Sequence, residues 1–437
     1  MMIDACRSCG SQKLHVVLDL GLHPVSNALL KSGEDPRVQK RHPLVVALCR
    51  DCALLQVTET VSASELYCCD FPYFSSTSST LLAHARAHAT NIMRTRSLGK
   101  DSLVIEIASN DGYLLRNFVE WGIPALGIDP AAAPAAAAIR GGVPTINDFF
   151  NLSLADQLAR QGKTADVMIA NNVVAHVDGI NDFIAAFKRA LKKDGIAFFE
   201  FAYGVDMIAN LEFDTIYHEH LFYHTLTAIR PLFERHGLYV NDVERLPIHG
   251  GSLRLHVEHQ RRESSRLHLL LEKERSLGVD KLTFYSAFAA EVERHAMALR
   301  AFLRELKSAD KRVACYGAAA KGATMLNYLD MGDNFFEFVA DANPFKQGKM
   351  MPGQNLPIVA PDTLSKMQPD YVLVLVWNIA NEIVRSQWGY CAEGGRFIVP
   401  LPALKIVSAD DFAAIDTAAA RGLPGLAAGT ALRSEIR

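Results

Sequence analysis

The segment 217–220, Tyr-His-Glu-His, places a phenol, two imidazoles and a carboxylate next to one another in the chain. An imidazole titrates near neutral pH and can take a proton from carbon or oxygen. A neighbouring carboxylate can fix the tautomer of that imidazole, and a phenol can donate to a developing oxyanion. The same residue types also occur on solvated loops and helix ends, so the surrounding elements must decide whether this segment does chemistry.

Four of the eight cysteines form two Cys-x-x-Cys pairs, Cys6 with Cys9 and Cys49 with Cys52. Each pair can present two thiolates to one tetrahedral ion, and a reducing cytosol disfavours the disulfide alternative. We expect a structural zinc ion held by all four thiolates, which leaves no open position for catalysis. His23 lies between the pairs and is left out of the ligand set, while its segment 20–28 is a candidate to reach towards another domain.

Short apolar runs alternate with helix-like segments from residue 103 onward. The runs at 103–108, 125–129, 166–170 and 196–201 are each bounded by Gly, Asp or Asn, a pattern that predicts a parallel sheet covered by helices. Residues 238–259 then predict an antiparallel hairpin around a glycine turn. An α/β sheet that ends in such a hairpin is typical of a class I methyltransferase.

The carboxyl ends of the first two predicted strands carry residues that suit a nucleotide-like cofactor. Glu106, Ala108, Asn110 and Gly112 stand at the end of the first strand, where small residues let the backbone approach a ligand. Asp129 ends the second strand and can accept both hydroxyls of an adenosine ribose, although it could simply cap a helix. The pyrophosphate motif GxGxxG is missing, which favours S-adenosylmethionine over NAD.

A later strand of the same sheet ends in Asn171 and Asn172 and is followed by His176. Its carboxyl edge faces cofactor and substrate in this architecture, so we expect the asparagines to contact the cofactor and His176 to act on the reacting group. The alternative interpretation of His176 is structural, because it stands among valine and alanine.

A second α/β unit is expected after long helices over 261–306. Its strands are predicted at 312–316, 336–340, 371–377 and 396–399. Lys321 follows a glycine-flanked turn and suits a diphosphate contact, although an exposed lysine there is usually only solvated. Trp377 and Asn378 close another strand edge and are further candidates to contact the nucleotide or sugar.

The predicted organisation has four parts. They are a zinc-binding domain over 1–75, a methyltransferase domain over 76–260, a C-terminal α/β domain over 261–410 and a tail over 411–437.

Composition places the chain among ordinary globular proteins, with 49% hydrophobic and 21% charged residues. The formal charge of −3 argues against nucleic acid as a partner. The sequence shows no apolar run of the roughly 18 to 20 residues that span a bilayer, and we recognise no signal peptide. We therefore expect a cytoplasmic protein that acts on small molecules, without a membrane partner.

The chain resembles the nucleotide-sugar C-methyltransferases of deoxysugar biosynthesis over nearly its whole length. The two Cys-x-x-Cys pairs carry this resemblance together with EIASNDG at 106–112, NNVVAH at 171–176, DTIYHEH at 214–220, HGGSLR at 249–254, YGAAAKG at 316–322 and DANPFKQG at 341–348. It implies a monomer with a zinc-bearing N-terminal domain, a central S-adenosylmethionine domain and a Rossmann-like C-terminal α/β domain that helps hold a sugar nucleotide. It also implies catalytic positions at His176, Tyr217, Glu219 and His220, with Tyr73 as a looser match because Tyr67 lies nearby.

Chemical need predicts a 4-keto sugar as substrate, because a ketone acidifies the proton on the adjacent carbon. The resemblance implies that this substrate is a nucleotide-diphosphate 4-keto-deoxysugar. We expect His220 to remove the C-3 or C-5 proton, Glu219 to orient or polarise His220, and His176 or Tyr217 to stabilise the enolate oxygen. The choice of His220 over His176 as base stays a hypothesis, and His218 is expected only to support the turn.

Several points stay open at the sequence level. They are the nucleotide base, a 3-amino substituent on the sugar and the methylated carbon, for which C-3 is favoured. A nucleotide-sugar-binding protein without catalysis and an NAD-dependent sugar oxidoreductase are the alternatives from other functional classes.

Overall fold

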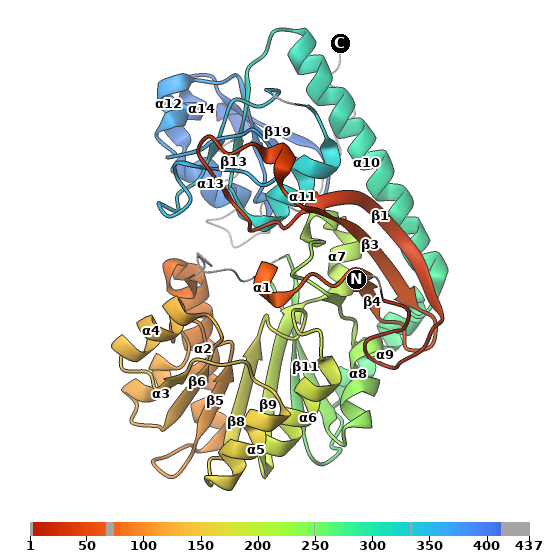
Figure 1. Ribbon diagram of the computed structural model, residues 1–437, viewed down its shortest axis with the longest axis vertical. Helices are drawn as coiled ribbons and strands as arrows, with labels where there is room; N and C mark the ends of the chain where they lie inside the picture. Colours follow the sequence, from red (N-terminus) through yellow and green to blue (C-terminus); the bar gives the residue numbers. More distant parts are fainter. Residues whose placement is uncertain (1–2, 67–73, 249, 333, 412–437) are drawn as a thin grey trace.

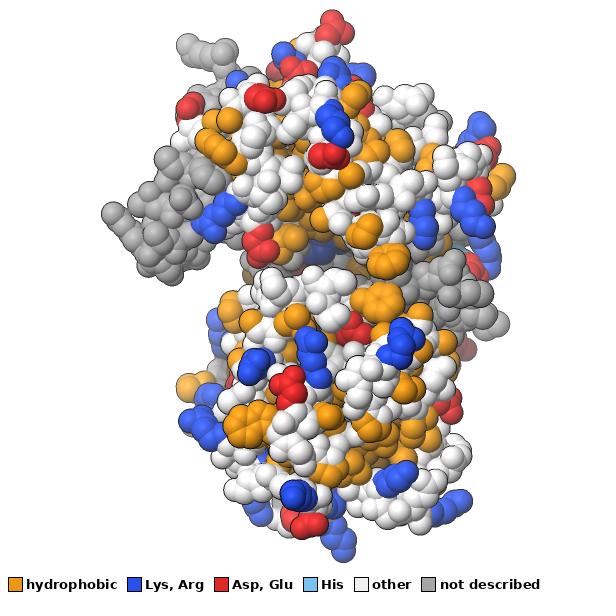
Figure 2. Space-filling view, turned by 90° about the vertical axis from the view of Figure 1, so that its left-hand side faces the viewer, with side chains coloured by type: hydrophobic (Ala, Val, Ile, Leu, Met, Phe, Trp, Pro, Cys, Tyr) orange, Lys and Arg blue, Asp and Glu red, His pale blue; other side chains and the backbone are white. Residues whose placement is uncertain are grey.

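The computed structural model describes residues 3–66, 74–248, 250–332 and 334–411. Figure 1 shows two lobes one above the other, bridged along one side by the long helix α10 (Leu282–Ser308) and by the hairpin of β1 (Leu14–Pro24) and β3 (Arg41–Cys49). Hydrophobic side chains gather on both sides of the furrow between the lobes (Figure 2). The chain therefore builds its two α/β units as separate lobes with the N-terminal hairpin running between them.

The N-terminal sheet is antiparallel, with the order β1-β3-β4-β10. Its third strand is β4 (Leu55–Val57), and its fourth, β10 (Phe222–Tyr223), comes from much later in the chain. Residues 24–41 connect β1 to β3 and form a segment that we call the arm. Within the arm, β2 (Leu30–Lys31) pairs with β15 (Lys349–Met350) of the C-terminal unit. The reach of segment 20–28 towards another domain is thus found in the structure.

The lower lobe contains a seven-stranded sheet in the order β11-β12-β9-β8-β5-β6-β7. Its parallel strands are β5 (Val104–Ile107), β6 (Ala125–Ile128), β7 (Thr145–Ile146), β8 (Ala165–Asn171) and β9 (Leu191–Ala202). The hairpin of β11 (Tyr239–Leu246) and β12 (Ser252–Glu258) closes one edge, with β12 antiparallel to β9. The predicted parallel sheet and terminal hairpin are confirmed.

Helices cover both faces of this sheet because alternate strand residues are apolar in both directions. Val104, Val167 and Phe198 pack on one face against α2 (Ser79–Arg96), α3 (Arg116–Glu120) and α4 (Ala132–Arg140). On the other face the sheet packs against α5 (Leu152–Arg160), α6 (Ile180–Ala190) and α8 (Leu226–Arg235). The carboxyl ends of the strands point up towards the other lobe (Figure 1).

The upper lobe contains a six-stranded sheet in the order β16-β14-β13-β17-β18-β19. The predicted strands appear as β13 (Val313–Tyr316), β14 (Val339–Ala340), β17 (Tyr371–Val374) and β18 (Arg396–Val399), and β16 (Ile358–Val359) and β19 (Lys405–Val407) extend the sheet. Its helices are α11 (Ala320–Leu329), α12 (Thr363–Met367), α13 (Ala380–Ser386) and α14 (Trp388–Ala392).

The long helices predicted over 261–306 appear as α9 (Ser265–Leu277) and α10. Gly278 ends α9 in a left-handed conformation with φ of 71°, which separates them. Strands β1 and β3 share one hydrophobic core with α10 and the upper sheet. Within the described residues no helix has the length and apolar character needed to cross a membrane.

Candidate active site

The four predicted zinc ligands converge at the end of the N-terminal hairpin. Their sulfur atoms all lie within 4.8 Å of one another, with 3.6 Å between Cys6 and Cys52 and 3.5 Å between Cys9 and Cys49. Tetrahedral zinc with Zn–S bonds of about 2.3 Å needs sulfur atoms roughly 3.8 Å apart, so the cluster fits the ion. His23 is buried and its Nε2 contacts the Leu20 carbonyl at 2.9 Å. The metal site is therefore made of four cysteines, as predicted.

The cofactor candidates lie at the carboxyl ends of β5 and β6, in backbone that turns sharply. Ala108, Asn110 and Gly112 have φ values of 54°, 50° and 77°, and a Cβ on Gly112 would lie 2.9 Å from Val143 Cγ2. Asp129 accepts the backbone N–H groups of Asn110 and Ala131, each at 2.8 Å. The carboxylate thus anchors the loop and the residue before the next helix without capping that helix, while each oxygen keeps a lone pair for a ligand.

Orphaned polar atoms line the same edge. Glu106 Oε2, Asp111 Oδ1 and Asn171 Oδ1 are buried without a hydrogen-bond partner among the described residues. Burial, together with the charges of Asp129 and Asp111, raises the pKa of Glu106 well above its usual range. Asn172 has φ of 54° and donates its N–H to the Glu200 carbonyl at 2.7 Å. Such unsatisfied buried groups fit an adenosyl amino acid, which carries hydroxyl and ammonium donors.

The segment 213–223 is held by three parts of the molecule at once. The Leu221 N–H donates to the Ala175 carbonyl beyond β8, and the Val57 N–H in β4 donates to the Leu221 carbonyl. On the side of the upper lobe, Thr324 Oγ1 of α11 donates to the Ile216 carbonyl at 3.0 Å. We call this segment the junction segment, because its backbone joins the zinc-bearing domain and both α/β units.

His218 belongs to the packing of the junction segment. Its Nε2 contacts the carbonyl of Pro43 in β3 at 3.1 Å, and its ring meets that of His42 edge-on at 5.6 Å. Burial lowers the pKa of His218 to about 4, so the ring is neutral near pH 7. This agrees with the expectation that His218 only supports the turn.

His220 and Tyr217 form a hydrogen-bonded pair. His220 Nδ1 lies 3.1 Å from the Thr215 carbonyl, which can only accept, so Nδ1 carries the proton in the neutral ring. Nε2 then carries the lone pair and accepts from the Tyr217 hydroxyl at 2.7 Å. We expected Glu219 to orient His220, and the structure gives that position to the Thr215 carbonyl instead.

Glu219 points to a different partner. Its Oε1 accepts from Asn27 Nδ2 of the arm at 3.0 Å, and its Oε2 has no partner among the described residues. The side chain is 2% exposed, and burial raises the pKa of Glu219 to about 7, against hydrogen bonds that lower it. A carboxyl group with a pKa near 7 can serve as either acid or base in the physiological range.

His176 completes the group. Its ring lies 4.7 Å from the ring of His220, centroid to centroid, at 73°. Burial lowers the pKa of His176 to about 4, and the hydrogen bond to the Glu219 backbone only partly opposes this. His176 is therefore neutral near pH 7 and is a weaker base than an exposed histidine.

Two of the substrate candidates of the upper lobe touch each other. Lys321 Nζ lies 3.1 Å from Asn378 Oδ1 and 4.9 Å from the centre of the Trp377 ring. Trp377 Nε1 donates to Asp214 Oδ2 at 2.8 Å, across the boundary with the junction segment. Burial raises the pKa of Asp214 to about 6, with Lys321 as the largest opposing charge. The lysine thus faces the same region as the junction segment.

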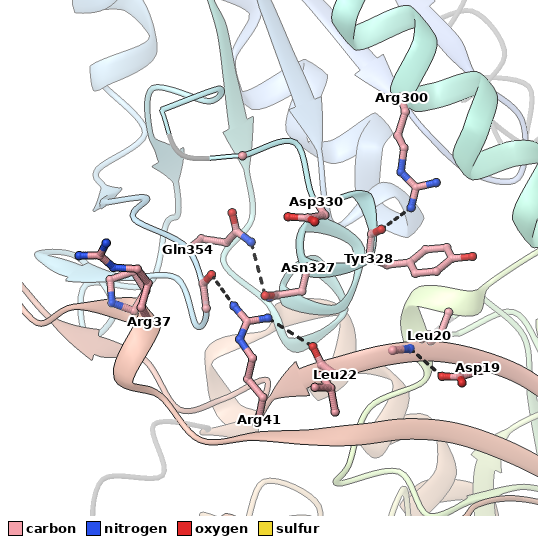
Figure 3. A pocket seen from close by; sticks show the side chains of 14 residues that line it. Asp19, Leu20, Leu22, Arg37, Arg41, Arg300, Asn327, Tyr328, Asp330 and Gln354 are labelled. Atoms are coloured by element: carbon pink, nitrogen blue, oxygen red, sulfur yellow. Dashed lines mark hydrogen bonds between the residues drawn. The ribbon is translucent and has the colours of Figure 1, made fainter.

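A cavity lies elsewhere in the molecule. It measures about 660 Å³ and lies between β1, the arm and α11, where Arg41, Arg300 and Asn327 are among the lining residues (Figure 3). The guanidinium groups of Arg41 and Arg300 donate to backbone carbonyls of Leu22, Gly353, Tyr328 and Leu329. None of the predicted site residues lines this cavity, and we interpret it as the joint between the N-terminal domain and the upper lobe.

The structure gathers the predicted residues of the lower lobe into neighbouring groups. His176, Tyr217, Glu219 and His220 share the junction segment and the loop it touches, and the cofactor candidates occupy the adjoining strand ends. Tyr73 lies outside the described residues. No contact is predicted from the sequence for Asn27, Thr215 or Asp214, although Asn27 lies in segment 20–28 and the other two lie in the motif at 214–220. Trp377 is predicted as a candidate for the nucleotide or sugar, and the structure pairs it with Asp214.

Comparison with protein families matches three profiles in sequence. Residues 6–67 match a zinc binding domain, residues 82–243 a methyltransferase domain and residues 247–402 a C-methyltransferase C-terminal domain. These three profiles follow the order of the N-terminal sheet, the lower lobe and the upper lobe.

Among characterised proteins, the C-methyltransferase NovU of Streptomyces niveus is 33% identical over 413 residues, which cover 93% of this chain and 98% of the relative. Among solved structures, magnesium protoporphyrin IX methyltransferase of Synechocystis aligns with 13% identity and a TM-score of 0.33, over 41% of this chain and 83% of that one. An S-adenosylmethionine-dependent methyltransferase of Clostridium acetobutylicum aligns with 11% identity and a TM-score of 0.33, over 42% of this chain and 92% of that one.

Proposed function

Because this chain belongs to the family of C-methyltransferases, we propose that it methylates the carbon next to the ketone of a nucleotide-linked 4-keto-6-deoxysugar, most favourably at C-3. A C-methyltransferase must first make a carbon nucleophilic. A ketone on the neighbouring carbon does this, because the carbanion delocalises into an enolate.

The observation that supports this proposal most is the gathering of His176, Tyr217, Glu219 and His220 in and beside the junction segment. These groups can take a proton from carbon and donate a hydrogen bond to oxygen, and both are needed to form an enolate. Enolisation is unnecessary when a methyl group goes to oxygen or nitrogen.

His220 is the base that we propose. Its tautomer leaves the lone pair on Nε2, where the Tyr217 hydroxyl now donates. When a 4-keto sugar is bound, the Tyr217 hydroxyl donates to the ketone oxygen and His220 Nε2 receives the proton from the adjacent carbon. Preorganised donors at a developing oxyanion lower such barriers by about 3 to 4 kcal/mol per donor.

The cofactor is S-adenosylmethionine, which supplies an electrophilic methyl group when it is bound. We propose that Asp129 and Glu106 hold it together with the backbone of 108–112 and the amides of Asn171 and Asn172. The left-handed backbone at Ala108, Asn110 and Asn172 supports this assignment, because it brings main-chain groups close to the strand ends.

Lys321 and Asn378 are the proposed contacts of the nucleotide diphosphate. Lys321 carries the positive charge that a diphosphate needs, and it stands near the start of α11 after the left-handed Gly317, with φ of 96°. The alternative carbon is C-5, because a 4-keto group acidifies the protons on both of its neighbours. Tyr73 stays a proposal from the family resemblance.

The test is methyl transfer from labelled S-adenosylmethionine to a panel of 4-keto nucleotide sugars, analysed by mass spectrometry in deuterated water. Methylated product together with deuterium at the carbon next to the ketone is the expected result. Methylation of oxygen, or turnover with NAD and not with the methyl donor, would contradict the proposal.

The other functional classes have less support. Membership of a C-methyltransferase family speaks against a binding protein without catalysis and against an NAD-dependent oxidoreductase. We also propose that the protein is a cytoplasmic monomer with small-molecule partners and that the domain limits follow the sequence prediction.

A further inference from the structure

The arm brings an amide to Glu219, a buried carboxylate of the junction segment. Asn27 Nδ2 donates to Glu219 Oε1 at 3.0 Å, and the Asn27 backbone is a second neighbour that favours the ionised form of Glu219. Glu219 Oε2 keeps no partner among the described residues although the side chain is only 2% exposed. One carboxylate oxygen is therefore fixed and the other is left for a ligand.

We propose that Asn27 is a positioning residue of the active site, which holds Glu219 so that its ionised carboxylate presents Oε2 to the substrate. The proposal rests on the proposed function in one respect, since it assumes that Glu219 acts on the substrate. It assigns part of the active site to the zinc-bearing domain.

The residues that follow Asn27 in the arm are bound to the upper lobe and to each other. On the far side, Lys31 and Leu30 pair with Lys349 and Met350 of the upper lobe. The Gln39 side chain accepts from the Gly353 N–H at 2.6 Å and donates to the Ala28 carbonyl at 2.7 Å.

Arg41 adds a further contact between the arm and the upper lobe. It donates to the Leu22 and Gly353 carbonyls at the wall of the large cavity (Figure 3). Asn27 thus belongs to a segment that is bound to the upper lobe. These contacts hold the arm, and with it the side-chain amide of Asn27, in place.

The electrostatics around Glu219 agree with this role. Burial raises the pKa of Glu219 to about 7, and the amide and backbone of Asn27 act against it. The other titratable groups that face Glu219 are Tyr223 on β10, whose pKa is raised by burial and to a smaller extent by the charge of Glu219, and His176, which bonds to the Glu219 backbone. Both are neutral near pH 7, so the ionised carboxylate is stabilised by its own backbone and by the side chain and backbone of Asn27.

Two substitutions separate positioning from mere packing. Asn27→Leu keeps the approximate size and removes the donor, while Asn27→Asp keeps the shape and adds a like charge. We expect the pKa of Glu219 to rise by about one unit in Asn27→Leu and further in Asn27→Asp. The control is Asn91→Leu on the exposed side of α2, where the lost contact is only with Arg94.

The measurement is a carbon-13 NMR titration of the zinc-loaded full chain labelled at the glutamate side-chain carboxyl carbons, with Glu219→Gln to identify the resonance. A Glu219 pKa unchanged in both Asn27 variants would overturn the proposal. This readout needs no substrate, so it stands apart from a failure of the proposed sugar reaction.

A kinetic experiment tests the assumed role of Glu219. For methyl transfer with a substrate from the panel, Asn27→Leu should lower kcat at pH 7 about fivefold, restore it near pH 9 and leave KM nearly unchanged, because a pKa shift from about 7 to 8 removes most of the ionised form. A uniform loss of kcat at every pH, with the Glu219 pKa unchanged, would assign Asn27 a packing role only.

Discussion

The pair of Tyr217 and His220 determines what the site can do at the level of single residues. The Thr215 carbonyl fixes the imidazole tautomer and the phenol occupies the remaining lone pair, so both groups are aligned before a substrate arrives. Alignment of this kind lowers the entropic cost of proton transfer, since few rotors need to be frozen in the transition state.

Replacing His220 with asparagine should therefore remove most of the activity while leaving the fold intact. We expect a loss of at least about 100-fold in kcat and in deuterium exchange at the carbon next to the ketone, because general base catalysis contributes about 10² to 10⁴. Exchange can be followed by NMR in deuterated water. His268→Asn on α9, where the side chain is 57% exposed, is the control, and full activity of the His220 variant would transfer the role of base to another group.

The sequence predicted some residues of the site but not the contacts that those residues make. The identities of Tyr217, Glu219 and His220 were visible as a dense run, but their partners were not. Asn27 and Thr215 contribute an amide and a carbonyl, and neither group is distinguishable in sequence from any other amide or carbonyl. The contact of Asn27 with Glu219 depends on how the arm folds. The contact of the Thr215 carbonyl with His220 depends on the 3₁₀ turn at Phe213–Thr215.

At the level of elements, the two α/β units share a loop design. Asn110 N–H donates to Asp129 Oδ2 at 2.8 Å in the lower lobe, and Ala318 N–H donates to Asp341 Oδ2 at 2.6 Å in the upper lobe. In each case an aspartate after the second strand fixes the turn after the first. The two units show no convincing sequence repeat, because different residues around the aspartates produce the same hydrogen bonds.

The turn after β13 gives a test of this design. Gly317 has φ of 96°, and a Cβ there would lie 2.4 Å from Val376 Cγ2, so Gly317→Ala combines backbone strain with a clash. Gly332 has φ of 86° with no atom within 4 Å of a new Cβ, and Gly332→Ala isolates the backbone strain.

We expect Gly332→Ala to lower the free energy of unfolding by about 1 kcal/mol and Gly317→Ala to lower it by at least about 2 kcal/mol. Urea unfolding of the upper lobe, followed by tryptophan fluorescence, measures both. Equal losses in the two variants would show that Val376 moves aside at no cost.

The contact between Asp214 of the junction segment and Trp377 of the upper lobe should contribute to stability in a pH-dependent way. Burial raises the pKa of Asp214 to about 6, so its contribution to stability is present in acid and is lost as the pH rises through about 6. Trp377→Phe removes the donor to Asp214 Oδ2 and raises that pKa further. The variant should therefore be destabilised by about 1 to 3 kcal/mol at pH 8 and by less at pH 5.

Thermal unfolding at the two pH values tests this expectation. Trp121→Phe, where the side chain is 72% exposed, is the matched control. The same loss of stability in Trp377→Phe at both pH values would mean that packing of the indole stabilises this contact and that its hydrogen bond to the Asp214 carboxylate does not.

Strand positions were predictable where the pattern was strong. The apolar runs with polar ends gave β5, β6, β8 and the centre of β9, because buried parallel strands are apolar on both faces. The two-residue strands β2, β10, β15 and β16 have no such pattern, and tertiary pairing alone defines them. Long helices were also predicted over 261–306, and Gly278 marks the break between α9 and α10, whose position was not predicted.

On the scale of the whole molecule, the zinc site and the chemistry are linked by the N-terminal hairpin. The cysteine cluster stands at one end of β1 and β3 and the arm at the other. Cys6 and Cys49 belong to the core of the lower lobe, whereas Leu18, Leu44 and Val46 belong to the core shared with the upper lobe. A metal that only stabilises structure can thus still be necessary for activity.

Zinc removal should test this connection. We expect one zinc per chain by elemental analysis, and loss of that zinc in Cys49→Ser or after chelation. Structural zinc contributes about 10 to 16 kcal/mol in small zinc peptides, so residues 6–57 should become sensitive to proteolysis and methyl transfer should fall together with metal content. Chelation of calcium or magnesium alone serves as control, and full activity in metal-free protein would contradict the structural role.

The pairing of β10 with β4 also has a consequence for how the protein is made. Phe222 and Tyr223 complete a sheet whose other strands end at Val57, and the entire parallel part of the lower sheet lies between them in the chain. During synthesis, the N-terminal sheet must remain one strand short on the ribosome until the central domain has been translated. Tyr217, Glu219 and His220 are translated immediately before the strand that closes this sheet, so these groups and the finished zinc-bearing sheet become available at the same point of synthesis.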